Sequence, residues 1–303
     1  MKYFIFLLLA TATTFFVGCS GSDNKNKTEL DQKFEVKVDN DEPDISNSQN
    51  NKRGEDVVFY NMFSPLDLDN IIDQKSSYFN SAYINSLNNI TKYTLSHKIA
   101  LNIGVYGADL SYLWMFEQTQ QAMSYLSAIQ LLTSKIGIPD KFVELTMQLA
   151  EKNADEMDSL IIIAKDAYYA TDKYLKSSER ESSAVLILLG GWIETLHIAV
   201  NMYNEPNSKL AAKIITQKYS LTSLITMIQN TQDDIVMSEY LLLMKKLNGG
   251  FKKLESQLDP KDIEIDTVNK RITIKETDNI KIDPKQFIEI KELTSQIRNH
   301  IIK

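Results

Sequence analysis

Residues 184–203 read AVLILLGGWIETLHIAVNMY, and residues 101–116 read LNIGVYGADLSYLWMF. Both stretches are apolar on nearly every side of a helix, and helices without a polar face are normally buried at the centre of a fold. Neither is long and clean enough for a membrane span, because Asp109, Glu194 and His197 interrupt them. The two stretches therefore predict helices at the centre of a helical core.

Small residues recur within both stretches. Ala100, Gly104 and Ala108 fall at intervals of four, and the second stretch contains Gly190 and Gly191. Glycine in a helix interior costs about 1 kcal/mol relative to alanine. Small side chains at helical spacing allow another helix to approach closely, so we expect tight helix packing at these positions.

The rest of the body continues the helical pattern. Glycine (10 of 303 residues) and proline (6) are scarce, whereas turn-rich β architectures need many of both. Apolar residues recur at helical spacing through a domain that we place at 57–258. The predicted fold is all-α, a multi-helix bundle or an array of helical hairpins. Its expected helices are 65–75, 77–97, 99–117, 119–136, 140–152, 154–177, 181–203, 207–217, 220–230 and 233–257, with the NGG of 248–250 as a candidate interruption of the last.

Residues 259–303 have a different character and are expected to pack on the helical domain. The sequence IEIDTVNKRITIKE alternates on both sides of a turn, which predicts a small C-terminal β-hairpin. One face of the hairpin would carry Ile263, Ile265, Ile272 and Ile274. Asp283 and Pro284 then provide an N-cap and a first helical residue, which predicts an amphipathic closing helix.

Lys2 is followed by an uncharged, mostly apolar run over 3–17, and this pattern is typical of a secretory signal. This run ends at Gly18 and Cys19 and resembles the lipobox of bacterial lipoproteins, although Phe16 stands where leucine is usual. The resemblance implies that 1–18 is a cleaved signal peptide and that the Cys19 sulfur carries diacylglycerol. The alternatives are a soluble secreted chain with an incidental cysteine, or a catalytic thiol.

Residues 19–56 are polar and are expected to form a disordered, lipidated tether, because they contain too few large apolar side chains to offset the entropy of ordering. As a flexible coil this segment would span about 35 Å. By resemblance to enteric lipoproteins, Ser20 after the cysteine favours the outer membrane. The periplasmic or surface face stays open.

Composition narrows the function classes. The net charge is −7 and no lysine or arginine run exceeds a pair, so nucleic-acid binding is not expected. The single cysteine excludes an internal disulfide. No cofactor is predicted. A candidate pocket is formed from polar and aromatic residues of the two apolar stretches: Asp109, Tyr112, Trp114, Trp192, Glu194 and His197.

Each candidate has a structural alternative. Glu194 and His197 share a helix face at the Glu-x-x-His spacing of ferritin-like di-iron ligands, but those proteins need two such motifs and the chain offers one. Metal binding is therefore left unknown, with a local Glu–His pair as the alternative. Asp109 can be a satisfied core acid or a pocket residue, and the aromatic residues can be core or line a groove.

The sequence favours a membrane-anchored lipoprotein of the bacterial envelope whose helical body is a non-enzymatic binding module. Its expected partners are the membrane, through the lipid, and an envelope protein or small ligand. The alternative is an enzyme with a buried site, with or without a metal, around Asp109, Glu194 and His197.

Overall fold

The computed structural model describes residues 78–303 apart from 154–155, 204–207, 232–234, 256–262, 267–270 and 275–282. The expected signal peptide (1–18), the tether with Cys19 (19–56) and the helix at 65–75 lie outside the described residues.

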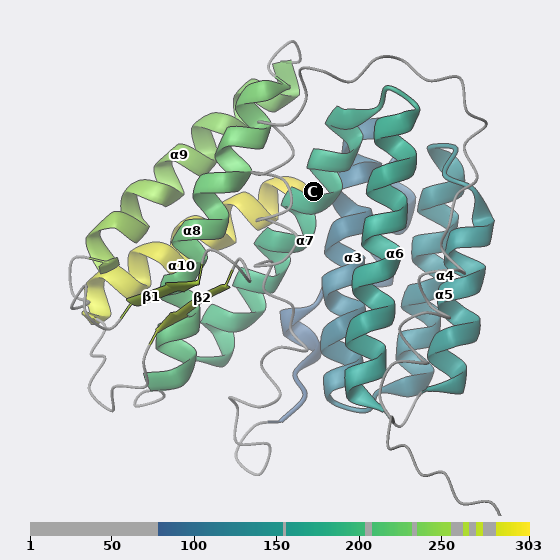
Figure 1. Ribbon diagram of the computed structural model, residues 1–303, viewed down its shortest axis with the longest axis horizontal. Helices are drawn as coiled ribbons and strands as arrows, with labels where there is room; N and C mark the ends of the chain where they lie inside the picture. The colour runs from purple at the N-terminus through teal and green to yellow at the C-terminus, as the bar shows by residue number, and fades with distance from the viewer. Residues whose placement is uncertain are drawn as a thin grey trace, which may run out of the picture. The chain divides into compact units, whose positions relative to one another are not determined.

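The described part of the chain is predominantly helical, which confirms the all-α class (Figure 1). Two short 3₁₀ helices, η2 (Ser81–Tyr83) and η3 (Leu87–Lys92), precede the long helices. The α-helices are α3 (Ser96–Met115), α4 (Thr119–Lys135), α5 (Asp140–Lys152), α6 (Met157–Ser177), α7 (Glu181–Met202), α8 (Ser208–Asn230), α9 (Ile235–Glu255) and α10 (Pro284–Ile302).

The two apolar stretches form α3 and α7, which pack together more extensively than any other pair of described helices. A Cβ atom on Gly104 would lie 1.9 Å from the carbonyl oxygen of Ile187, and one on Gly190 would lie 1.9 Å from that of Leu101. The two backbones therefore touch where glycine removes the side chain. The expected close approach is confirmed at both glycines.

In Figure 1, α7 lies between the group α3–α6 and the group α8–α10. The contacts agree, because α7 packs on α3, α6, α8 and α10. Among the described helices, α7 alone is long and apolar enough to cross a membrane, but 94% of its apolar window is buried inside the protein. It therefore has the environment of a core helix.

The helix expected at 77–97 is wrong. The chain there is irregular apart from η2 and η3 until α3 begins at Ser96. Its short polar side chains compete with helix formation, since Asn80 accepts a hydrogen bond from the amide of Ala82 and Ser86 accepts one from that of Asn88.

Two expected interruptions are absent from the described helices. The predicted helices 207–217 and 220–230 are one continuous helix, α8, because no glycine or proline separates them. The NGG of 248–250 also stays helical within α9. A Cβ on Gly250 would lie 2.8 Å from Cδ1 of Ile290 in α10, so this glycine allows close packing of α9 on α10 rather than a turn.

After α9, strands β1 (Ile263–Asp266) and β2 (Arg271–Ile274) pair antiparallel, with Ile263 opposite Ile274. The closing helix α10 then begins as expected. The side chain of Asp283 accepts a hydrogen bond of 2.9 Å from the amide of Lys285, and Pro284 is the first helical residue. α10 packs on α7 and α9 and belongs to the same core.

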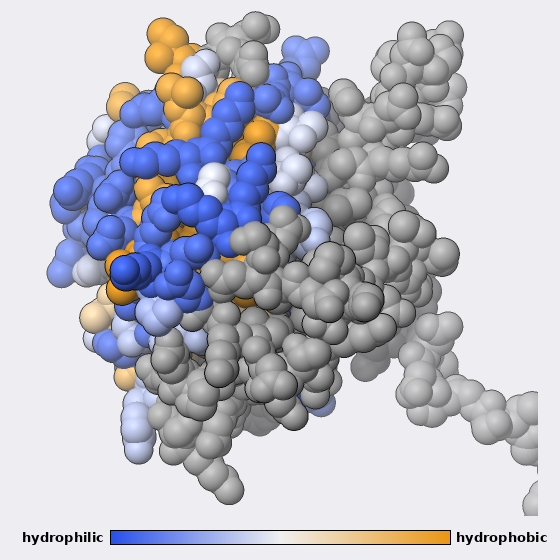
Figure 2. Space-filling model, turned by 90° about the vertical axis from the view of Figure 1, so that its left-hand side faces the viewer, coloured by the Kyte–Doolittle hydropathy of each residue, from blue (hydrophilic) through white to orange (hydrophobic). Residues whose placement is uncertain are grey.

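The described residues on the face that carries α9 are mostly hydrophilic, with apolar side chains in strips between hydrophilic ones (Figure 2). The large apolar side chains most exposed on α9 and α10 are Ile235, Leu242 and Ile288. Isolated exposed apolar residues are normal on protein surfaces, so they do not mark an interface by themselves.

Candidate functional site

Two of the predicted site residues meet in the core. Asp109 on α3 and Glu194 on α7 are fully buried. The carboxylate of Glu194 accepts hydrogen bonds of 2.7 Å from Nε and 2.6 Å from Nη2 of Arg298 on α10. This two-pronged geometry is the strongest form of an ion pair between these groups. The pair joins two helices whose paired residues are 104 positions apart in the sequence.

Asp109 is the second acid of this buried cluster. Its Oδ2 accepts a 3.0 Å hydrogen bond from the backbone amide of Asn85. Burial raises the pKa of Asp109 well above its ordinary value, and the charge of Glu194 and a hydrogen bond to it raise the pKa further. Oδ1 of Asp109 receives no hydrogen bond from any described residue. A proton on this oxygen can be donated to Glu194, so the cluster holds one anion, one cation and one neutral acid.

Asp109 is therefore expected to tolerate asparagine but not alanine. An asparagine side chain would keep the acceptor for the Asn85 amide and a donor towards Glu194, whereas Asp109→Ala removes both and should cost about 1–3 kcal/mol. Because the pKa of Asp109 is raised in the folded state, the contribution of this group to stability is fully present below about pH 4 and is lost as pH rises towards that pKa. Urea unfolding at about pH 4.5 and pH 7.5 tests this. The free energy of unfolding of Asp109→Asn, relative to that of the wild type, should be higher at about pH 7.5 than at about pH 4.5. A relative value that is lower at the higher pH would contradict the raised pKa of Asp109.

Asp109 and nearby tyrosines hold residues 80–93, a segment that is irregular apart from η2 and η3 and that we call the strap. Tyr106 donates a 3.1 Å hydrogen bond to the carbonyl of Ser86, and Tyr125 donates one of 2.8 Å to that of Asn85. The hydroxyl of Tyr112 accepts a 3.1 Å bond from the amide of Asn80. Buried backbone groups outside regular structure need such partners. These tyrosine side chains thus provide hydrogen-bond partners for backbone groups of the strap.

The side-chain amide of Asn85 is the hub of this arrangement. It donates to the hydroxyl of Tyr93 at 2.9 Å and to Oδ1 of Asn102 at 3.3 Å. Asn102 in turn donates to the carbonyl of Ile301, and Tyr93 donates to that of Ile302, both at 3.2 Å. The strap and the carboxyl end of α10 are therefore tied to the same face of α3.

His197 does not take part in the ion pair of Glu194. Its ring Nδ1 lies 3.3 Å from the side-chain amide of Asn201. Burial lowers the pKa of His197 to about 3, and the charges of Arg298 and Lys291 contribute to the shift, so the ring is neutral at physiological pH. Within the described ranges, no three His, Cys, Asp or Glu side chains are grouped closely enough to hold a metal ion.

The aromatic candidates are dispersed. Tyr112 packs against Phe79 and Phe116, with ring centroids 5.6 and 5.0 Å away. Trp192 is buried in α7, and its Nε1 has no hydrogen-bond partner among the described residues. Of the six predicted pocket residues, only Trp114 lines an apolar cavity between α3 and α6.

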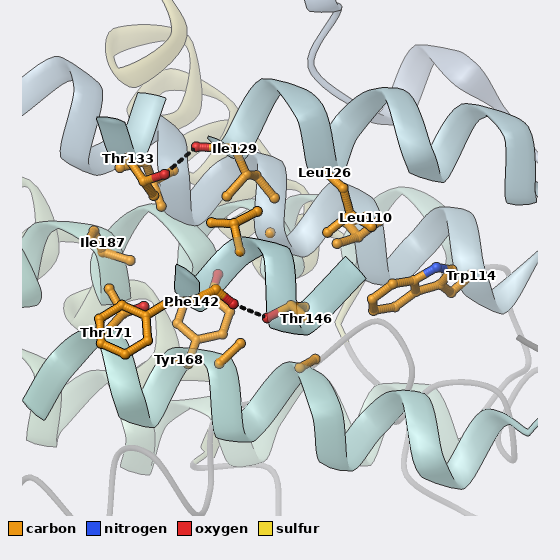
Figure 3. A pocket seen from close by; sticks show the side chains of 15 residues that line it. Leu110, Trp114, Leu126, Ile129, Thr133, Phe142, Thr146, Tyr168, Thr171 and Ile187 are labelled. Atoms are coloured by element: carbon orange, nitrogen blue, oxygen red, sulfur yellow. Dashed lines mark hydrogen bonds between the residues drawn. The ribbon is translucent and has the colours of Figure 1, made fainter. Parts of the chain in front are cut away.

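That cavity has a volume of about 80 Å³ and lies among α3, α4, α5, α6 and α7 (Figure 3). We call it the α3–α6 cavity. None of its lining residues carries a charge. Its walls are Ile103, Gly107, Leu110, Trp114, Leu126, Ile129, Thr133, Phe142, Val143, Thr146, Ala164, Ala167, Tyr168, Thr171 and Ile187.

The glycine at position 107 and the tyrosine at position 168 shape one wall. A Cβ on Gly107 would lie 2.4 Å from the Tyr168 hydroxyl, so the ring seats against bare backbone. The same hydroxyl donates a 3.1 Å hydrogen bond to the carbonyl of Gly104. Burial raises the pKa of Tyr168, which keeps the hydroxyl neutral. Tyr168 thus links α6 to α3 close to the contact between α3 and α7.

No family model, no curated protein and no solved structure matches this chain.

Two parts of this site had no clear signal in the sequence. Nothing in the amphipathic pattern of α10 distinguishes Arg298 as the partner of Glu194. The cavity draws residues from five helices, most of which look like ordinary core positions. Gly107 was the available signal, since a glycine inside an apolar helix often marks a close contact.

Proposed function

We propose that the chain is a lipid-anchored lipoprotein of the bacterial envelope, directed to the outer membrane by the residue after Cys19, and that its helical body binds a small apolar ligand. The observation that carries the binding role is the α3–α6 cavity, because an apolar hollow inside a packed helical body is the usual form of a small-ligand site. The lipobox resemblance at Cys19 supports the anchor.

The polar cluster has a different part in this proposal. Glu194 forms an ion pair with Arg298, and Asp109 accepts a hydrogen bond from the backbone amide of Asn85 in the strap. In this proposal both acids stabilise the fold rather than act on a substrate. We also propose that the hairpin of β1 and β2, together with helix α10, closes the helical domain.

Binding is tested with the full chain by following the thermal midpoint in the presence of small apolar compounds. A ligand present at about 100 times its dissociation constant should stabilise the folded state by about 2.7 kcal/mol. A panel of apolar compounds that leaves the midpoint unchanged at saturation would overturn the binding role.

The anchor is tested separately by intact mass. The exported protein should begin at Cys19 and carry two or three acyl chains, since one chain gives only marginal membrane attachment. Cys19→Ser should abolish the acyl mass and release the chain from the membrane fraction. A mature chain with a free thiol at Cys19, or with a different first residue, would contradict the anchor without touching the binding role.

A further inference from the structure

The α3–α6 cavity is long relative to its volume. Its lining on α3 runs from Ile103 to Trp114, a rise of about 16 Å at about 1.5 Å per residue. Figure 3 shows the labelled side chains strung out from Thr133 and Thr171 at one end to Trp114 at the other. A volume of about 80 Å³ over that length leaves a narrow channel. For comparison, a compact engineered cavity that takes up benzene measures roughly 150 Å³.

The hydroxyl groups of Thr133, Thr146 and Tyr168 in the walls already donate to backbone carbonyls. Thr133 donates to the carbonyl of Ile129 at 3.0 Å, and Thr146 donates to that of Phe142 at 2.8 Å. Tyr168 donates to the carbonyl of Gly104 at 3.1 Å. A polar or charged ligand group would lose its hydration inside the channel without gaining these donors. The part of a ligand that enters the channel is therefore hydrocarbon.

The channel is not sealed along α6. All four of its α6 lining residues are only partly buried, although they face the interior of the helix group: Ala164, Ala167, Tyr168 and Thr171. A ligand can therefore place its chain inside and keep a polar head in water beside α6. This arrangement suits an amphiphile with one slender tail.

We propose that the α3–α6 cavity binds one unbranched alkyl chain of an amphiphile, with the head group outside the cavity. The inference rests on the proposed binding function and specifies its ligand class. Shape excludes compact ring compounds, and the lining excludes charge within the channel.

Tryptophan fluorescence provides a direct test, because Trp114 lies at one end of the channel and the chain has only two tryptophans. Trp192→Phe leaves Trp114 as the sole reporter. The full-length Cys19→Ser, Trp192→Phe chain, which lacks the acylation site, is titrated with linear alcohols brominated along the chain. Saturable quenching is expected, and affinity should rise about fourfold per added methylene until the channel is filled.

A filled channel should lose this binding. Ala167→Leu places a larger side chain in the channel, and Ala212→Leu is the matched control, because Ala212 is a partly buried alanine on α8, which does not line the cavity. The affinity measured by quenching should fall at least about tenfold in the first variant and stay unchanged in the second. Thr146→Val, which keeps the shape and removes a hydroxyl, gives an independent reading and should bind alkyl chains at least as well.

The outcomes separate the two proposals. Binding of benzene or cyclohexanol without linear alcohols overturns the alkyl-chain inference but leaves the binding role intact. Loss of binding in Thr146→Val also overturns it, because the hydroxyl would then be a recognition group. Failure of every compound overturns both. Quenching by vesicles of phospholipid with brominated acyl chains assigns the tail to membrane lipid, and quenching by monomeric alcohols alone assigns it to a free amphiphile.

Discussion

Arg298→Ala is expected to destabilise the folded protein by about 3–5 kcal/mol, because it leaves the buried carboxylate of Glu194 without its cation. Domains have free energies of unfolding of about 5–15 kcal/mol, so this loss is a large fraction of the total. The midpoint of urea unfolding, followed by circular dichroism at about pH 7, measures it. Glu194 and the neutral Asp109 would then share a dry site that has lost the positive charge of Arg298.

The matched control removes both charges together. In the double variant Glu194→Gln with Arg298→Met, neither member of the pair is left as an unpaired ion, and glutamine can still accept a hydrogen bond from the protonated Asp109. The double variant should therefore be more stable than Arg298→Ala alone. If the double variant is instead as unstable as the single one, the loss comes from packing of the long arginine side chain and the electrostatic account is wrong.

Gly190→Ala is the second change with a large expected effect. The new Cβ would lie 1.9 Å from the carbonyl oxygen of Leu101, which is backbone and cannot rotate away. The α3 and α7 helices would have to separate along their whole contact, so stability should fall by about 1–3 kcal/mol or more. This net loss is expected although alanine favours a helix by about 1 kcal/mol over glycine.

Gly249→Ala is its control, because it is the same substitution in a helix with open space around it. No described atom lies within 4 Å of a Cβ built at Gly249. Stability should therefore rise by about 0.5–1 kcal/mol. Equal effects of Gly190→Ala and Gly249→Ala on the thermal midpoint would show that α3 and α7 are not in backbone contact.

Much of the helical core could be predicted from the sequence because its signals are local. The apolar stretches of α3 and α7 and the Asp283–Pro284 start of α10 are all readable over a few turns of helix. The helix expected over the strap was wrong because the conformation of this segment depends partly on contacts that are not local in the sequence. Its apolar spacing resembles a helix, but it is held in an irregular form. Side chains of the strap accept hydrogen bonds from its own backbone amides, and the hydroxyls of Tyr106 and Tyr125 donate to its backbone carbonyls.

The candidate site was harder to predict, because its parts meet only through the tertiary fold. Asp109 and Glu194 could be singled out as acids in apolar helices, and the structure brings them together. His197 lies three residues after Glu194 in the sequence, but its ring contacts Asn201 instead. The cavity depends on how α5 and α6 lie over α3, which no spacing within one helix can encode.

The pairing of Glu194 with Arg298 also bears on the order in which the protein can fold. The two residues are 104 positions apart, and Tyr93 reaches a carbonyl 209 positions further along the chain. Contacts of such separation form late, since closing long loops costs entropy before any bond is gained. Until α10 has been synthesised, Glu194 on α7 is without its arginine counterion. The ion pair between α7 and α10 can therefore contribute to stability only in the last stages of folding.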